Sequence, residues 1–289
     1  MTPVVITGAS GMLGYEATTR LPATEIIAIY RSAPQTPFPR NIQTYRTADL
    51  FDRDWFGAVA PEATIIHCAG LADPRSSADS SHLAKAKAEA MLFETLRQAG
   101  WRGRLILPSS AAVYGAPGRA PVLETTEPRP ISAYGNLKLA TEAAFLAEAG
   151  LPLTILRFAS LYGSEAARPG QGIIRILRDR LADRRPFTLF GDGATCRDYL
   201  HIKDAVAAIA ATLEYSHNDT FNIGTGIATK VIDLIAMTER LTGETLQIER
   251  RPAVAEAGST ILDPTRAAET FGWRAKIPLE DGLRRYLTA

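Results

Sequence analysis

The feature that most constrains the fold is a glycine-rich segment directly behind an apolar run at the start of the chain. The run 4–7 is followed by Gly8, Gly11 and Gly14. Between a strand and a helix, such glycines permit a tight turn, a close backbone approach to a pyrophosphate and close packing of the helix on the strand. The first N–H groups of the helix would then face the phosphates. The segment predicts a dinucleotide site made by Thr7, Gly8, Ser10, Gly11, Met12, Leu13 and Gly14.

Short β-branched runs alternate with helical patterns through the first half of the chain. Strands are expected at 4–7, 25–30, 42–47, 64–68, 104–108 and 153–158, and helices at 13–20, 82–99 and 133–149. This alternation predicts parallel strands with helices on both faces. Beyond residue 163 the strands shorten, with runs at 187–190, 220–223 and 246–250. We expect an α/β fold: a Rossmann-like doubly wound parallel sheet at 1–163, and a smaller C-terminal substrate-binding lobe at 164–289 whose segments can interleave with the first domain.

Composition and charge exclude several classes of partner. The 289 residues carry a formal net charge of +1, so no nucleic-acid surface is expected. The two cysteines lack metal-ligand spacing, which predicts no metal site and a reducing compartment. No stretch reaches the roughly 18 apolar residues that a membrane span needs, and no secretion signal is evident. The expected location is the cytoplasm, away from any membrane.

The end of the second expected strand bears on the choice of cofactor. An acidic residue there would bind the ribose hydroxyls of NAD, whereas an arginine would accept the 2′-phosphate of NADP. The chain has Tyr30, Arg31 and Ser32 at this point and no acid. NAD and NADP are both candidates, and Arg31 slightly favours NADP unless it is a solvated loop charge. Asp49 and Leu50, after the third strand, are expected near the adenine amino group.

Two segments have the residues for proton transfer. Ser110 follows an expected strand, while Tyr134 and Lys138 are four residues apart and share one face of an expected helix. An isolated tyrosine titrates near pH 10, too high for a general base at neutral pH, so a lysine ammonium is needed to favour the phenolate. Ligands of open α/β sheets bind at the carboxyl edge of the strands, where Ser110 is expected. We predict Ser110, Tyr134 and Lys138 as the catalytic residues, the last two also contacting the cofactor.

These motifs, taken in order, resemble the extended short-chain dehydrogenases/reductases of the NAD(P)-dependent nucleotide-sugar epimerase/dehydratase group. The resemblance covers nearly the whole chain. Besides the residues above, it includes His67-Cys68-Ala69-Gly70, Val113-Tyr114-Gly115, Leu156-Arg157-Phe158, Phe190-Gly191-Asp192-Gly193, Arg197-Asp198-Tyr199-Leu200-His201, Phe221-Asn222-Ile223-Gly224 and Gly272-Trp273.

The resemblance implies a nucleoside-diphosphate sugar as the substrate and a homodimer built by the helix at 133–149 and the helix before it. It implies redox chemistry at a sugar carbon, as C4 epimerisation or 4-keto reduction, with Tyr134 as general acid and base. Further cofactor contacts are implied for Cys68, Ala69 and Gly70. Substrate contacts are implied for Ser110, Ala111, Tyr134, Ser160, Arg197 and Arg251.

Departures from the family pattern leave alternatives open. The Asp-Glu pair that 4,6-dehydratases carry after the strand-end serine is Ala111-Ala112 here, which argues against that chemistry. Ser160 replaces a family asparagine, and Arg197 could pair internally with Asp198 instead of binding a diphosphate. A dehydrogenase for a free sugar acid or polyol, and a non-catalytic NAD(P)-sensing protein on the same fold, are the alternative functions. His67 and His201 are interpreted as structural.

Overall fold

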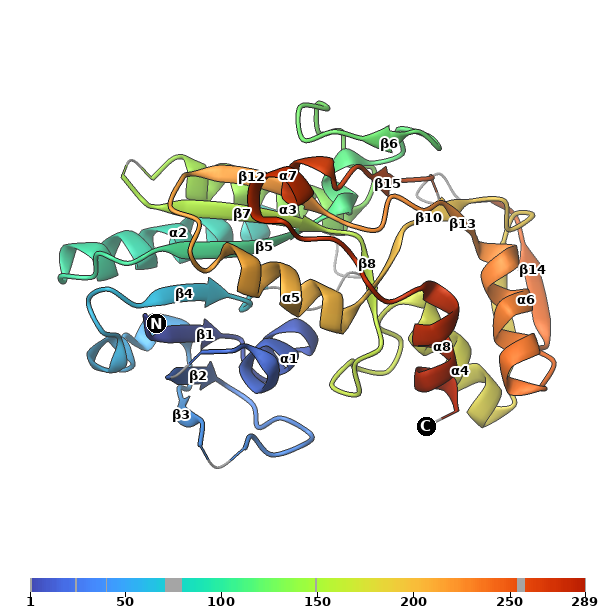
Figure 1. The fold of residues 1–289 in the computed structure, drawn as a ribbon, viewed down its shortest axis with the longest axis horizontal. Helices are drawn as coiled ribbons and strands as arrows, with labels where there is room; N and C mark the ends of the chain where they lie inside the picture. Colours follow the sequence, from blue (N-terminus) through green and yellow to red (C-terminus); the bar gives the residue numbers. More distant parts are fainter. Residues whose placement is uncertain are drawn as a thin grey trace.

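The computed structural model describes residues 2–23, 25–39, 41–70, 80–148, 150–253 and 258–288, with the side chains of 80–82 excepted. Within these ranges seven parallel strands form one sheet in the order β12-β7-β5-β4-β1-β2-β3 (Figure 1). Their bounds are β1 (Val4–Thr7), β2 (Ile26–Tyr30), β3 (Gln43–Arg46), β4 (Thr64–His67), β5 (Leu105–Ser110), β7 (Leu153–Phe158) and β12 (Asp219–Ile223). The expected doubly wound parallel sheet is confirmed.

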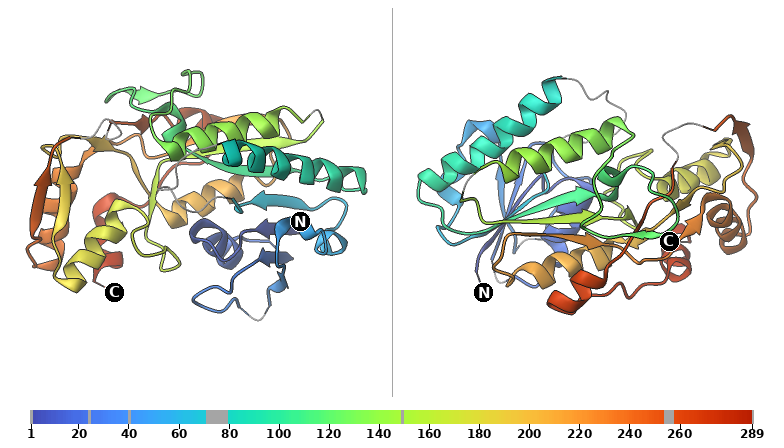
Figure 2. Two further views of the ribbon diagram at one scale, coloured as in Figure 1. Left: turned by 180° about the vertical axis from the view of Figure 1, so that it is seen from behind. Right: turned by 90° about the horizontal axis from the view of Figure 1, so that it is seen from above.

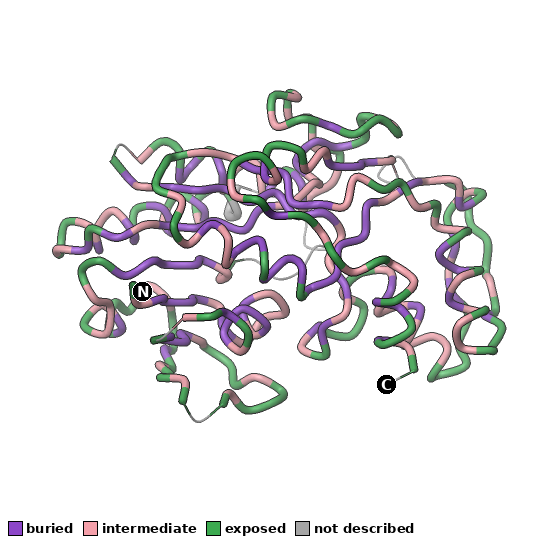
Figure 3. The backbone as a smooth tube through the Cα atoms, in the orientation of Figure 1, coloured by how far each residue is buried: buried purple, intermediate pink, exposed green. Residues whose placement is uncertain are grey.

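Helices cover both faces of the sheet. One face packs against α1 (Met12–Arg20) and α5 (Ile202–Thr212), and the other against α2 (Ser80–Gln98) and α3 (Ala133–Leu146), which lie side by side (Figure 2). Within β1, Val4 and Ile6 face the first layer and Val5 faces the second. Because successive strand residues point to opposite faces, a strand covered on both sides must be apolar throughout. The buried central strands are visible in Figure 3.

A smaller lobe lies at one end of the sheet (Figure 1). Its own core joins side chains of three helices and two short sheets. The helices are α4 (Ile173–Asp183), α6 (Val231–Thr242) and α8 (Leu279–Leu287). The strand pairs outside the main sheet are β9 (Phe187–Phe190) with β14 (Ile248–Arg251), β10 (Cys196–Arg197) with β13 (Thr229–Lys230), β11 (Tyr199–His201) with β8 (Ser160–Tyr162), and β15 (Ile261–Leu262) with β6 (Pro121–Val122).

Short elements complete the chain. Single 3-10 turns form η1 (Leu50–Asp52), η2 (Phe56–Ala58) and η3 (Ala111–Tyr114), and helix α7 (Thr265–Phe271) lies beside β12.

One strand from beyond residue 163 lies in the main sheet. The run at 220–223 forms part of β12, which extends this sheet beyond β7, with Phe221 opposite Leu156 and Ile223 opposite Phe158. Phe221 and Ile223 are fully buried, because the chain returns from the lobe to cover the edge of β7. The expected helix at 133–149 ends at Leu146, and residue 149 lies outside the described ranges.

Candidate active site

The glycine turn is held by contacts that leave no room for side chains. Gly8 has a left-handed backbone with φ of 66°, and a Cβ atom on it would lie 2.6 Å from the Ala69 Cα. A Cβ atom on Gly14 would lie 2.9 Å from the carbonyl carbon of Gly8. The turn, the first helix and the end of β4 therefore pack backbone against backbone. Gly11 is the N-cap of α1 and has no side chain to accept from the first N–H groups, so these can face an anion.

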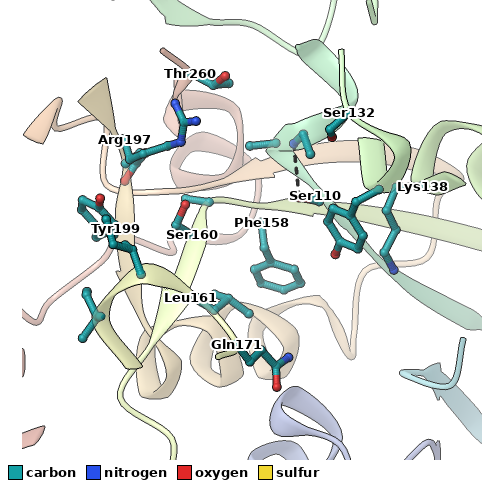
Figure 4. Close-up of a pocket in the computed structure, with 18 of the residues that line it drawn as sticks. Ser110, Ser132, Lys138, Phe158, Ser160, Leu161, Gln171, Arg197, Tyr199 and Thr260 are labelled. Carbon is teal, nitrogen blue, oxygen red and sulfur yellow. Dashed lines mark hydrogen bonds between the residues drawn. The ribbon is translucent and has the colours of Figure 1, made fainter. Parts of the chain in front are cut away.

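The turn opens into a cavity of about 640 Å³ at the carboxyl edge of the sheet (Figure 4). Both lobes contribute to its wall. From the sheet and its helices come Gly11, Met12, Leu13, Gly14, His67, Cys68, Ala69, Gly70, Ser110, Ala111, Ala112, Tyr134 and Lys138, and from the other side come Ser160, Leu161, Gln171, Phe190, Arg197, Tyr199 and Thr260. The size lies within the roughly 300–1,000 Å³ that is usual for small-molecule and cofactor sites.

The three residues predicted to be catalytic all line this cavity. Ser110 ends β5, and its Oγ accepts the Ala112 N–H at 3.2 Å, which fixes its rotamer at the start of η3. The Lys138 Nζ donates to the Pro108 carbonyl at 3.1 Å, which ties α3 to the same strand. A Cβ atom on Gly135 would lie 3.1 Å from the Ala112 carbonyl carbon, so the first turn of α3 rests directly on η3.

The residues expected at the adenosine end of the cofactor lie outside the wall of this cavity. Arg31 and Ser32 are exposed after β2, and Asp49 and Leu50 begin η1 after β3. The Asp49 carboxylate accepts the Phe51 N–H at 3.1 Å, so it serves as a helix cap. None of these described residues, nor Tyr30, lines the cavity. Thr7 is fully buried behind the turn, where its hydroxyl lies 2.7 Å from the His67 Nδ1.

Arg197 and Asp198 do not pair with each other. The Arg197 Nη1 donates to the carbonyls of Cys196 and Gly258, and burial lowers the pKa of its guanidinium. Asp198 is buried and accepts both the N–H and the hydroxyl of Thr225. Arg197 therefore faces the cavity without a carboxylate partner among the described side chains. Such a desolvated cation favours an anionic ligand.

Arg251 is placed differently from Arg197. Its side chain is more than half exposed on β14, pairs with Glu249 at 2.8 Å, and is not part of the described cavity wall. The structure thus brings Arg197 and Ser160 to the cavity and leaves Arg251 on the surface of the lobe.

Residues 4–224 match the sequence model of a protein family, described as the NAD dependent epimerase/dehydratase family. The chain belongs to this family. An Escherichia coli relative, dTDP-4-dehydro-6-deoxyglucose reductase, is 31% identical over an alignment of 233 residues that covers 78% of this chain and 73% of that protein.

Solved structures agree over almost the full length. The UDP-glucose 4-epimerase of Thermotoga maritima with UDP-glucose has a TM-score of 0.87 and 28% identity, covering 99% of this chain and 98% of that one. MoeE5 in complex with UDP-glucuronic acid and NAD has a TM-score of 0.86 and 28% identity, with the same coverage. The resemblance to the epimerase/dehydratase family, found first in the motifs, is confirmed.

Tyr199 was not among the residues predicted for the site. Its side chain is buried and lines the cavity, yet its hydroxyl has no hydrogen-bond partner among the described residues. Burial raises the pKa of this phenol, which therefore remains a donor. The sequence spacing could have indicated it. Residues two apart in an extended segment share a face, and Tyr199 is two residues from Arg197, which was predicted to bind the substrate. Gln171 and Thr260 also line the cavity and had no comparable signal.

Two polar residues beside the turn have structural explanations. Burial raises the pKa of the Cys68 thiol to about 12, although Lys138 opposes this, so the thiol remains protonated. His67 lies between Thr7 and Glu89 and against the rings of Phe93 and Phe145. In the part of the chain that the structure describes, no three His, Cys, Asp or Glu side chains gather as a metal site would require. No described helix is long and apolar enough to span a membrane.

Proposed function

We propose that this protein is a UDP-sugar 4-epimerase that uses NAD. The observation that carries the proposal is the shared cavity: Ser110, Tyr134 and Lys138 line the same space as the glycine turn and Arg197. A dinucleotide fits the turn, because the glycine contacts leave a cradle that a Cβ atom would fill and the helix N-terminus faces it. The related structures that hold UDP-sugars, one of them with NAD, support this choice.

Each of the three residues has one role in the proposal. Bound nicotinamide supplies the hydride acceptor and donor. Tyr134 removes and returns the proton of the 4-hydroxyl, and Ser110 hydrogen-bonds the same oxygen. The Lys138 ammonium stabilises the negative tyrosine oxygen during this transfer. Ala111 and Ala112 offer no acid or base for eliminating water, so 4,6-dehydration is not proposed.

Arg197 is proposed to bind the diphosphate. Its guanidinium lies on the cavity wall without a carboxylate partner among the described side chains, and phosphate oxygens can accept from such a group. This anchor argues against a free polyol as the substrate, since a polyol carries no anion. A free sugar acid, whose carboxylate an arginine can also bind, is distinguished by testing its turnover in the same assay. Arg251, which does not line the described cavity, is not included in this anchor.

The experiment is a turnover assay with NAD and UDP-glucose, followed by the formation of UDP-galactose. Tyr134→Phe is expected to lower turnover at least about 100-fold, as the loss of a general acid–base does, while NAD still raises the melting temperature. Tyr215→Phe is the matched control, because the Tyr215 hydroxyl donates to Asp219, outside the cavity wall. Full turnover by Tyr134→Phe would refute the catalytic role, and a wild type that binds NAD but turns over nothing would favour a sensor.

A second candidate is reduction of a 4-keto sugar by NADPH. The absence of an acid after β2 and the exposed Arg31 favour it, as does the similarity to the E. coli reductase. Denaturing the purified protein and identifying the released cofactor separates the two. Stoichiometric NAD excludes the reductase, because an epimerase must retain its cofactor between half-reactions. An empty site that binds NADPH tightly excludes the epimerase.

We also propose a homodimer through α2 and α3. Leu83, Met91 and Leu146 on these helices are 44%, 61% and 63% exposed. An apolar face on two adjacent helices suits a two-fold contact with a second copy. Met91→Lys is expected to give monomers, whereas Ile227→Lys, at a similarly exposed residue elsewhere, leaves the dimer intact. A wild-type mass of 31.2 kDa in solution would refute the dimer.

A further inference from the structure

A row of buried polar side chains crosses three neighbouring strands next to the candidate catalytic residues. Ser109 on β5 is opposite Arg157 on β7, and Arg157 is opposite Asn222 on β12. All three are at least nine-tenths buried. Side chains at aligned positions of parallel strands emerge on the same face, so the three form one continuous polar line beneath α3.

Glu142 of α3 contacts this row from the helix layer that covers this face of the sheet. Its carboxylate accepts from the Arg157 Nη2 at 2.6 Å and from the Arg157 Nε at 3.1 Å, a two-pronged contact. The Ser109 hydroxyl donates at 2.5 Å to the Glu142 Oε1, the oxygen that also accepts from the Arg157 Nε. Glu142 is 2% exposed and Arg157 is 7% exposed. The charge and hydrogen bonds of Glu142 raise the pKa of Arg157 against the opposing effect of burial.

The row also fixes the end of η3. The Arg157 Nη1 donates to the Tyr114 hydroxyl at 2.8 Å, and this hydroxyl donates to the Asn222 Oδ1 at 2.8 Å. The Asn222 Nδ2 donates in turn to the Val122 carbonyl at 2.8 Å. The turn that begins directly after Ser110 is thus tied at its far end to β7 and β12.

Two members of this polar cluster are close in sequence to the candidate catalytic residues. Tyr134, Lys138 and Glu142 are spaced four apart on α3, so they follow one face of the helix. Ser109 directly precedes Ser110 on β5. We propose that Glu142 and Arg157 are positioning residues, which hold α3 and η3 against β5 so that Tyr134 and Lys138 face Ser110. The proposal rests on the catalytic roles proposed above for those three residues.

Stability alone does not explain this ion pair. A buried pair gains little over well-packed apolar side chains of similar volume, because both charges must leave water. The ion pair adds geometric specificity. The Glu142 carboxylate can bind the guanidinium and the Ser109 hydroxyl together in only one position of α3 along the strands. An apolar contact would tolerate a small slide of the helix, and displacements of about 1 Å can slow a reaction about 100-fold.

The test compares Glu142→Gln with Asp204→Asn. Asp204 is a second buried carboxylate, which accepts the backbone N–H groups of Lys276 and Ile277 at 3.0 and 2.9 Å and does not line the cavity. Both variants exchange a buried carboxylate for an amide, so Asp204→Asn reports a loss of stability alone. On each NAD-loaded protein, hydrogen exchange of the amides at 134–138 and NADH formation after mixing with UDP-glucose are measured.

In Glu142→Gln we expect exchange at 134–138 to be at least about tenfold faster than in Asp204→Asn, with NAD affinity unchanged. NADH formation should slow about 10- to 100-fold, with little change in the UDP-glucose concentration at half-maximal rate. The double variant with Tyr134→Phe should be no slower than Tyr134→Phe alone, because Glu142 acts through Tyr134.

Equal exchange at 134–138 in the two variants would overturn the proposal, as would rate losses that multiply in the double variant. A wild type that forms no NADH with UDP-glucose would count against the proposed function, while the exchange comparison still decides the positioning role. If Glu142→Gln does not fold, Arg157→Lys replaces it, since that variant keeps the positive charge and removes the two-pronged contact with Glu142. Unchanged exchange and rate in Arg157→Lys would then overturn the proposal.

Discussion

Gly14→Ala tests the cofactor turn most directly. The new Cβ atom would lie 2.9 Å from the Gly8 carbonyl carbon and closer still to its oxygen. Carbon atoms in contact are about 3.5–4.0 Å apart, so the overlap is roughly 0.6–1 Å. The obstructing atoms are backbone, and Gly8 is itself packed against Ala69. The helix must therefore move away from the turn, and the N–H groups that face the phosphates move with it.

The size of the effect follows from that overlap. Overpacking of this kind costs about 1–3 kcal/mol, which in a chain of this length lowers the melting temperature by roughly 2–10 °C. The loss of one or two charge-assisted hydrogen bonds should weaken NAD binding at least about tenfold. Gly11→Ala should have a smaller effect, because its Cβ atom would lie 3.3 Å from the Gly8 oxygen.

The assay is thermal unfolding with and without NAD, because a ligand that binds only the folded state raises the melting temperature by mass action. Gly57→Ala is the matched control, since its Cβ atom meets nothing within 4 Å and its backbone is not left-handed. We expect Gly57→Ala to be neutral or slightly stabilising. If Gly14→Ala matched Gly57→Ala in stability and in its response to NAD, the packing argument would be wrong.

Three further predictions concern other parts of the molecule. Arg197→Met should weaken UDP binding, measured by calorimetry, at least about tenfold, and should leave the melting temperature of the unliganded protein nearly unchanged. An undiminished affinity for UDP would exclude the diphosphate-binding role of Arg197. Arg31→Asp should shift the ratio of NAD to NADP affinity toward NAD about tenfold or more, and a constant ratio would make Arg31 a solvated charge. Burial lowers the pKa of His201 to about 4, from 6.5 when unfolded, and its Nδ1 accepts the Lys203 N–H. Only the unfolded state gains the proton between these values, so stability should fall by up to about 3 kcal/mol as the pH drops from 6.5 to 4; His201→Asn should flatten the dependence in chemical denaturation, and an equally steep profile would contradict it.

The part of the fold that could be predicted is the part fixed by local patterns. Every residue of β1 is buried, so a strand covered on both faces reads as a continuous apolar run, and the glycines after it mark the turn. The sheet that contains the strand at 220–223 could not be predicted, because nothing in Asp219–Ile223 specifies β7 as its partner strand. Local patterns identify a strand but not its neighbours.

The candidate site likewise contains residues that local patterns could predict and residues that they could not. Ser110, Tyr134 and Lys138 could be found because their order and spacing follow from one strand end and one helix face. Arg251 could not be placed, since its partner Glu249 and its exposure depend on how β14 packs. The ion pair of Glu142 with Arg157 joins α3 to β7, the next strand along the chain, and neither residue type signals this contact in the sequence.

The link between the two lobes explains how one cavity can contain both ends of a sugar nucleotide. Along the short stretch from β7 to β8, Phe158 is opposite Ser110 and Ser160 is opposite Tyr199. Backbone hydrogen bonds hold the stretch on both sides, from Ala159 to Ile223 and from Ser160 to Asp198. In Figure 4, Phe158 lies between Ser110 on one side and Arg197 and Tyr199 on the other. The fold itself therefore separates Ser110 from the proposed diphosphate anchor by this stretch, so we expect a substrate to need a group between its reacting hydroxyl and its diphosphate in order to contact both.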